Sequence, residues 1–396
     1  TIGVYLNSSN SSYSLDSNLP VLDNTGGPVY GIFVDNDTTD AFSLTINAGL
    51  NATATNATGG SKALGVYGNG FFENATSRPI EFSITTNGVI NVFANGTGEV
   101  IAGGAVGNFT NVVNNGTVNV AGIAGNATTS LMVGGIGGNN VDNFINNGGI
   151  YVRGEGTGEV IAGGAVGNFT NIVNNGTISA NATANATNGN AEAYGVNAWG
   201  NTGNFTNTGT ISANASATGG DAYAGGVYTY YYGWRTIDNF TNTGTISANA
   251  NATGGDAEAA AVDTWDIGNF ANTGSITATA TGDDAEAFAV DTWNIGNFAN
   301  TGSILANATA TGDDAYAEGV DAGDIGSFTN SGTISATATG YYADAYGVDA
   351  GDIGYFANTG TISATATATD DYAYAEGVYA GDIGSFTNSG TISATA

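Results

Sequence analysis

The sequence predicts an all-β fold, a parallel β-solenoid (β-helix) of about eleven rungs, with about 28–35 residues and about three short strands in each rung. Three observations lead to this prediction. A short segment recurs with a period of about 30 residues, apolar residues alternate with hydroxyl residues inside each period, and the composition disfavours helices. A unit of this length cannot bury its apolar face alone, so successive units must stack and the chain becomes a rod.

The recurring segment has the form Phe-x-Asn-x-Gly-x-Ile. It begins at Phe205, Phe240, Phe270, Phe298, Phe328, Phe356 and Phe386. Weaker copies begin at Ile84, Val112, Phe144 and Ile172, and residues 96–111 are identical to residues 156–171. We therefore expect a repeat array over residues 81–396 that arose by tandem duplication.

Each unit is expected to contain its strands in a fixed order. In one unit the stretches are Ala315–Glu318, Ile325–Phe328 and Ile334–Thr339. In the last of these, apolar and hydroxyl residues alternate, as they do in a strand with one buried face. Gly-Asp and Asn-x-Gly sequences separate the stretches and are typical of corners.

Residues of one type return at the same place in successive units, so each should stack on its copy about 4.8 Å away. Columns of Val, Ile and Phe are interpreted as the interior, with Ala at the other inward positions. The Asn of each segment is expected to form a ladder of amides at a corner. The Val column is Val262, Val290, Val320, Val348 and Val378, the Ile column is Ile267, Ile295, Ile325, Ile353 and Ile383, and the Asn column is Asn207, Asn242, Asn272, Asn300, Asn330, Asn358 and Asn388.

Residues 1–80 differ from the array in composition. They contain Pro20, Pro28 and Pro79, which are all 3 prolines, and also Lys62 and Arg78, which are two of the 4 basic residues. We expect this part to be an N-terminal cap or assembly region that donates a strand, distinct from the array at 81–396.

The composition excludes several classes of function. The chain has no Cys and no His, which excludes disulfides, ordinary zinc sites and catalytic arrangements built on Cys or Ser with His. A net charge of −30 makes nucleic acid and anionic membranes poor partners and cations good ones. No apolar stretch of about 18 residues is present, so no membrane span is expected. The chain begins at Thr1 without an initiator Met, which favours an exported, extracellular product.

Acidic residues fall in register in two columns. The first contains Asp263, Asp291, Asp321 and Asp349. The second contains Asp266, Asp324, Asp352 and Asp382, and Asn294 interrupts it. Stacked carboxylates repel one another unless a counterion or a proton relieves them, and Ca²⁺ prefers such oxygen ligands. Calcium bridging is therefore one interpretation, and Asp side chains that accept backbone N–H groups at solvent-exposed corners are the other. No other cofactor is expected.

Glycosylation sequons of the form Asn-x-Ser/Thr are frequent. Those at strand-outward or loop positions are the candidates for modification, and they are Asn51, Asn56, Asn181, Asn185, Asn214, Asn251 and Asn307.

Aromatic residues suggest a possible binding strip. Trp199, Trp234, Trp265 and Trp293 precede core aromatic residues, and Tyr228 and Tyr230–Tyr232 cluster. Such a strip could bind sugar or a neighbouring rod, or be a hydrophobic edge under a loop.

Catalysis and ice binding are weaker alternatives. Polysaccharide-cleaving β-helices need a few carboxylates that converge in one cleft, whereas the acids here repeat with the lattice, so we expect no enzyme. Outward Thr rows are typical of ice-binding solenoids, but Asn181, Asn214, Leu305 and Asn307 interrupt the rows.

The N-x-G-x-I corners of residues 81–396 resemble the repeats of extracellular β-helical surface proteins, notably autotransporter passengers and filamentous-haemagglutinin-like adhesins. The resemblance implies a solenoid at the cell surface, with adhesion to glycans or neighbouring cells as its expected role.

The ends of the chain suggest self-assembly. Ile2, Val4 and Leu6 alternate as in a strand, and the coil that contains Ile392 has no polar cap. We expect the N-terminal region of one subunit to complete the C-terminal coil of the next, which gives a head-to-tail filament. The alternative is a monomeric adhesin stalk, or a fragment of a larger adhesin.

Overall fold

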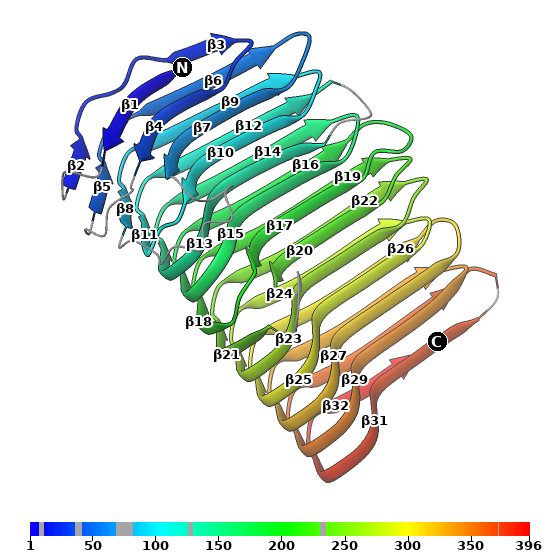
Figure 1. Cartoon of the computed structure of the whole chain (residues 1–396). Helices are drawn as coiled ribbons and strands as arrows, with labels where there is room; N and C mark the ends of the chain where they lie inside the picture. Colours follow the sequence, from blue (N-terminus) through cyan, green and yellow to red (C-terminus); the bar gives the residue numbers. More distant parts are fainter. Residues whose placement is uncertain (8–11, 36–41, 69–81, 126–129, 230–234, 371) are drawn as a thin grey trace.

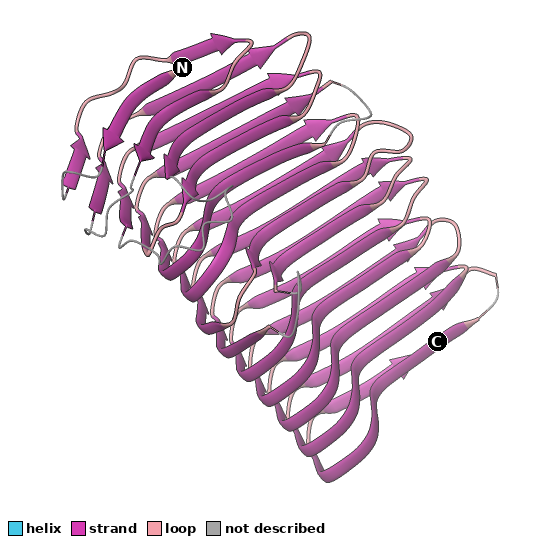
Figure 2. Cartoon of the chain, viewed as in Figure 1, coloured by secondary structure: helices cyan, strands magenta, loops and turns pink. Residues whose placement is uncertain are grey.

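The computed structural model describes residues 1–7, 12–35, 42–68, 82–125, 130–229, 235–370 and 372–396. It confirms an all-β parallel solenoid, with about 12 turns and no helix among the described residues. The turns stack along a rod, from the N-terminal turns (blue) at one end to the C-terminal turns (red) at the other (Figures 1 and 2). Strand spacing of about 4.8 Å makes the rod roughly 60 Å long.

One side of the rod is sheet B, which has 13 parallel strands. These are β3 (Leu22–Thr25), β6 (Leu50–Asn56), β9 (Val89–Gly96), β12 (Thr117–Ala124), β14 (Gly149–Gly156), β16 (Thr177–Ala184), β19 (Thr210–Thr218), β22 (Thr245–Thr253), β24 (Ser275–Gly282), β26 (Ser303–Ala310), β28 (Thr333–Gly340), β30 (Thr361–Ala368) and β32 (Thr391–Thr395). Buried and outward residues alternate along these strands, as predicted for Ile334–Thr339, and the outward residues are mostly polar, with exceptions such as Val89 and Ile123.

The remaining strands form sheet A, which has 19 strands. In some turns two separate strands contribute. The first of each pair is β1 (Ile2–Asn7), β4 (Val29–Asp35), β7 (Ser61–Gly68), β10 (Val100–Gly107), β17 (Ala191–Ala198) or β20 (Ala222–Tyr228), and the second is β2 (Ser12–Leu15), β5 (Phe42–Ile46), β8 (Phe82–Thr86), β11 (Asn111–Asn114), β18 (Thr202–Asn207) or β21 (Thr236–Asn242).

In the other turns of sheet A the two predicted strands run on as one bent strand of 15–17 residues. These strands are β13 (Leu131–Asn146), β15 (Val160–Asn174), β23 (Ala257–Asn272), β25 (Ala285–Asn300), β27 (Asp314–Asn330), β29 (Tyr342–Asn358) and β31 (Ala373–Asn388). The prediction of three short strands per rung therefore fits only some turns, because ladder pairing continues through the corner where paired strands keep the same register on both sides of it, as β27 and β29 do.

Strand pairing begins at β1 and not at residue 81. Val4 pairs with Ile32, Ile32 with Val66, and Val66 with Ala105 of the repeat array. The described part of residues 1–80 thus forms turns of the same coil, and the compositional boundary is not a boundary in the sheets. These turns keep the inward apolar residues but lack the Phe-x-Asn-x-Gly-x-Ile segment, so the repeat in the sequence did not predict them. A role of this part in assembly stays a prediction.

The predicted interior columns are confirmed. From Phe205 to Phe386 the phenylalanine rings stack with centroids 4.7–5.0 Å apart and interplanar angles of 1–3°. The rings are buried except for Phe386 in the last described turn, which is 53% exposed. Aligned columns of this kind bury apolar surface continuously along the rod.

The predicted asparagine ladder lies at the corner between the two sheets. From Asn114 to Asn358 each side-chain Nδ2 donates to Oδ1 of the next Asn over 2.7–2.9 Å. Nδ2 of Asn330 also lies 3.3 Å from the carbonyl oxygen of Thr361. The buried amides thus satisfy one another and the backbone of the corner. No helix of the described residues is long and apolar enough to cross a membrane.

Candidate functional site

A longitudinal groove runs along the outer face of sheet A. It follows from a close approach of the two sheets inside the rod: a Cβ atom at Gly319 would lie only 2.6 Å from Cγ2 of Ile334 in sheet B. Small residues occupy this approach along the column: glycine stands at Gly65, Gly319 and Gly347, and buried alanine stands at the equivalent positions Ala261 and Ala289. Because sheet A bends inward there, the outward columns on both sides of the bend face one another across the groove.

Near the N-terminus the groove is apolar. Leu64, Tyr67 and Val106 form a small cluster that is separate from the main core. Further along, Gly103, Gly134 and Gly163 follow one another in one column of sheet A. An apolar hollow of about 450 Å³ lies at these glycines, and Met132 is among the residues that line it.

Towards the C-terminus the groove becomes acidic, and a cavity of about 850 Å³ lies there. Asp263, Asp291, Asp321 and Asp349 line it and stack in register, as their column predicted. Glu318, from the column on the other side of the bend, lines the same cavity. The sequence analysis did not single out Glu318, because only the bend brings it beside the Asp column.

The carboxyl groups of the groove favour their protonated form. Burial, and then the charges of Asp263, Asp321 and Glu258, raise the pKa of Asp291 to about 8. Burial raises the pKa of Asp263 to about 6, against a hydrogen bond from Tyr223. The pKa of buried Glu318 is raised strongly by burial and by the charge of Asp321, although Tyr316 donates a hydrogen bond to its Oε1 atom.

The second Asp column lies at an exposed edge outside this cavity. The backbone N–H of Asp382 donates to Oδ1 of Asp352 over 3.1 Å, which is the corner interaction expected as the alternative to calcium. Asp324 is also exposed, and Asn294 interrupts the column and donates to Asp266.

The described residues contain no group of three or more acidic side chains that could hold a metal ion. Stacking places the Asp residues in rows along the rod, whereas Ca²⁺ needs six to eight oxygen atoms around one point. Calcium bridging therefore has no preformed site in this part of the chain, and it stays a prediction for solution experiments.

Aromatic side chains border the acidic cavity. The indole rings of Trp265 and Trp293 stack with centroids 5.2 Å apart and an interplanar angle of 10°, and Trp293 is 59% exposed. Trp199 and Tyr228 line the groove, whereas Trp234 and Tyr230–Tyr232 lie outside the described residues. The predicted aromatic strip thus exists in part.

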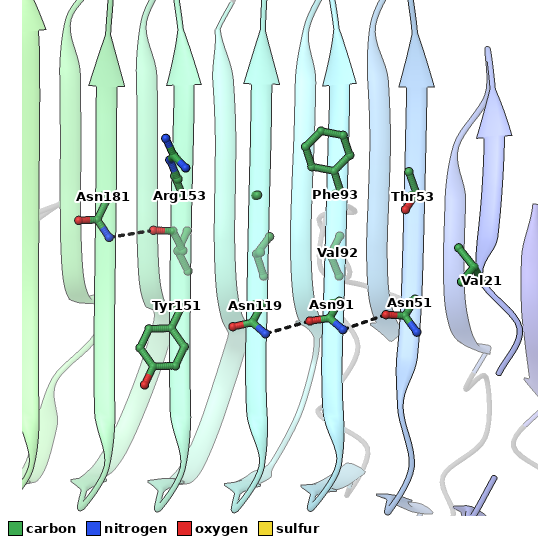
Figure 3. A pocket seen from close by; sticks show the side chains of 13 residues that line it. Val21, Asn51, Thr53, Asn91, Val92, Phe93, Asn119, Tyr151, Arg153 and Asn181 are labelled. Atoms are coloured by element: carbon green, nitrogen blue, oxygen red, sulfur yellow. Dashed lines mark hydrogen bonds between the residues drawn. The ribbon is translucent and has the colours of Figure 1, made fainter. Parts of the chain in front are cut away.

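The outer face of sheet B carries a row of asparagines that the sequence analysis did not identify. Figure 3 shows Asn51, Asn91 and Asn119 bonded in series, with Nδ2 to Oδ1 distances of 2.8 and 2.9 Å, beside a shallow hollow of about 460 Å³. Tyr151 ends this row, because Ser179 follows it in the same column. Asn181 stacks on Arg153 in the adjacent outward column and accepts a hydrogen bond there from Asn214. The row has no simple signal in the sequence, because its members are 40 and 28 residues apart and do not share one motif.

The candidate glycosylation sites fall into two groups, those with exposed side chains and those whose side-chain amides form hydrogen bonds. Asn185, Asn251 and Asn307 are exposed. In contrast, Nδ2 of Asn56, Asn181 and Asn214 donates hydrogen bonds, and Oδ1 of Asn51 accepts one. Because a glycan is attached to Nδ2, the three exposed residues are the better acceptors, and modification stays a prediction.

The residues predicted for assembly lie at the two ends of the described coil. Val4 and Leu6 pack partly against the chain's own core, and Ile2 is largely exposed. Ile392 is partly buried in the last turn.

Comparison with known proteins adds no functional assignment. No protein-family model, curated protein or solved structure matches this chain. The fold that the resemblance implied, a parallel β-solenoid, is confirmed by the structure. The resemblance to autotransporter or haemagglutinin-like adhesins rests on the repeats alone, and no match supports membership of either family.

Proposed function

We propose that the chain is a structural subunit of an extracellular, cell-surface filament that assembles head to tail. The observation that carries this proposal is the continuity of the lattice. One inward column runs from Val4 through Ile32 and Val66 to Val348 and Val378, so the first and last described turns share the register of this column. A second copy can therefore continue the coil in register.

The two end turns match in chemistry as well as in position. By register, Phe386 would stack on Tyr13 of the next subunit, and Ala394 would stack on Leu22. Phe386 and Tyr379 are about half exposed in the last turn, and such stacking would bury them. Edge strands offer unpaired backbone groups to a further strand, which adds hydrogen bonds to the apolar contact.

This arrangement changes how the N-terminal residues would act. Val4 and Leu6 already belong to a turn of the coil, so they would present an edge to the next subunit and need not detach as a donated strand. Removal of residues 1–8 would leave β4 as a new edge with equivalent residues Ile32 and Val34. That deletion is therefore a weak test of assembly, and a charge placed at the end is a stronger one.

The proposed extracellular location, and the proposed partners other than a second copy of the chain, are inferred from composition and repeats. An acidic, cysteine-free chain with frequent sequons and repeats like those of surface adhesins fits the cell exterior, where glycans or neighbouring cells would be the other partners. The proposal includes no enzymatic activity and no cofactor. A monomeric stalk, or a coil continued by a longer chain, is the competing arrangement.

Electron microscopy of the intact chain and of two matched variants tests the proposal. The intact chain should form long fibres of uniform width, more readily at about 0.15 M salt than at low salt, because screening weakens repulsion between chains of net charge −30. Phe386→Asp should abolish fibres, because it places a charge in the end contact. Tyr355→Asp, at a side chain 44% exposed on the flank of the rod, should leave them unchanged. Short single rods from the intact chain, or normal fibres from Phe386→Asp, would contradict head-to-tail stacking.

A further inference from the structure

The acidic part of the groove has the features of a binding site on the flank of the rod, away from the end contacts of a filament. Its first feature is an aromatic surface. Trp293 stacks on Trp265 on one side, while the following positions in the column are Gly323 and Gly351. Glycine has no side chain to cover the next indole face, so a ligand can lie against Trp293.

The second feature is a pair of buried polar atoms without a partner. Oε2 of Glu318 and Oγ1 of Thr264 make no hydrogen bond within the described residues, although these residues are only 1% and 2% exposed. Both residues line the cavity. Because its pKa is raised, Glu318 is protonated at neutral pH and can donate to the Asp321 carboxylate, which leaves Oγ1 of Thr264 as the atom without a partner. A buried hydroxyl without a partner favours a ligand that brings a hydrogen-bonding group.

The third feature is uncompensated charge. Glu258, Asp263, Asp291, Glu318, Asp321 and Asp349 line one cavity, and no Lys or Arg lines it. Repulsion and burial in this cavity favour bound protons, as the raised pKa values of these groups indicate. A positively charged ligand can replace such a proton, and the face of an indole attracts the same charge.

We propose that this cavity binds an organic ammonium ligand, with its charged group among Asp291, Asp321 and Asp349 and its apolar body against Trp293. The Asp column repeats along the groove at the strand spacing of about 4.8 Å, which favours an extended ligand with several ammonium groups. A polyamine and a chain of amino sugars share this chemistry.

Isothermal titration calorimetry at pH 7 with four probes tests the proposal. The probes are spermidine, a hexamer of glucosamine, a hexamer of glucose and CaCl₂. At least one of the two ammonium probes should bind at one site per chain, and the probe that binds more tightly identifies the source. Failure of both to bind overturns the proposal, and so does equal binding of the neutral hexamer or displacement by an equal concentration of Ca²⁺.

Matched variants separate a site from general attraction to an acidic chain. Trp293→Ala, Asp321→Asn and Asp291→Asn should each weaken binding by about tenfold or more, because each removes a contact to the charge or to its aromatic surface. Asp352→Asn, an exposed acid outside the cavity, changes the net charge equally and should alter the affinity by less than about twofold. Equal losses in all four variants would overturn the proposal. Circular dichroism and the melting temperature of each variant establish that it is folded, and the three cavity variants together keep the test decisive if one of them does not fold.

Discussion

The turns near the N-terminus and those near the C-terminus share one lattice but fill it differently. The column that holds stacked phenylalanines in later turns begins with Tyr13, Leu44 and Ile84. At the corner, Leu15 and Ile46 occupy the column that later becomes the Asn ladder. The outer groove changes from apolar to acidic over the same length. The coil thus requires inward apolar side chains and strands that stay in register from turn to turn. Ladders of identical residues are not required for it, since the early turns form without them.

The largest difference in stability between the early and the later turns should appear when a residue of the Phe column is truncated. Phe328→Ala removes a buried ring from between Phe298 and Phe356 and should cost about 3–5 kcal/mol of local stability, since both neighbours lose a stacking partner. Leu44→Ala, in the same column of the early turns, should cost less within the range of about 2–5 kcal/mol for Leu truncation, because no stack is interrupted. Amide hydrogen exchange of the affected turns measures both. A loss below about 1 kcal/mol for Phe328→Ala would contradict an interior stack.

The Asn ladder should give the next largest effect. Asn330→Ala leaves Oδ1 of Asn358 without its donor and removes one acceptor from Nδ2 of Asn300, which keeps the carbonyl oxygens of Gly302 and Thr333. We expect a loss of about 1–3 kcal/mol for the buried group left unsatisfied. Thr86→Ala, in the early turn of the same column, interrupts no amide ladder and should cost about 1 kcal/mol. Chemical denaturation compares the two variants with the parent, and equal losses would mean that the ladder adds nothing to corner packing.

The acidic groove should make the later turns sensitive to pH. The folded-state pKa of Asp291, about 8, lies above its unfolded value of 3.8, so its contribution to stability is complete below about pH 4 and is lost as the pH rises towards 8. Glu258, with a pKa of about 7, and Asp263, with a pKa of about 6, act in the same direction. The melting temperature should therefore fall between pH 4 and pH 8. Asp291→Asn should recover about 1–3 kcal/mol at pH 8, whereas the exposed Asp352→Asn should not. A stability that rises over this range would refute the protonated groove.

The smallest effect is expected from calcium removal. Because the described residues hold no group of acids that could bind a metal ion, a chelator at low salt should shift the melting temperature by less than about 1 °C. A clear fall that added Ca²⁺ reverses would instead support calcium bridging between the Asp columns, through a rearrangement of their side chains.

Repetition made most of the fold predictable. Phe328, Asn330 and Ile334 recur in register, and a period of about 30 residues with inward alternation leaves a parallel coil as the arrangement that buries every unit. The early turns escaped the same reasoning because Tyr13 and Leu15 meet only the general requirement for apolar inward residues. The Asp column could be predicted as a column, but its burial could not.

The sequence by itself determined the solenoid, its interior columns and its excess of negative charge, since each follows from local alternation and from a period that repeats along the chain. Only the tertiary structure decided where the outward columns meet. Glu318 and Asp321 lie on opposite sides of a bend, where small residues, Gly319 in this turn and Ala289 in the turn before, let sheet A approach sheet B. Contacts across the rod, between residues of different strands, set this approach, and no pattern within one strand records it.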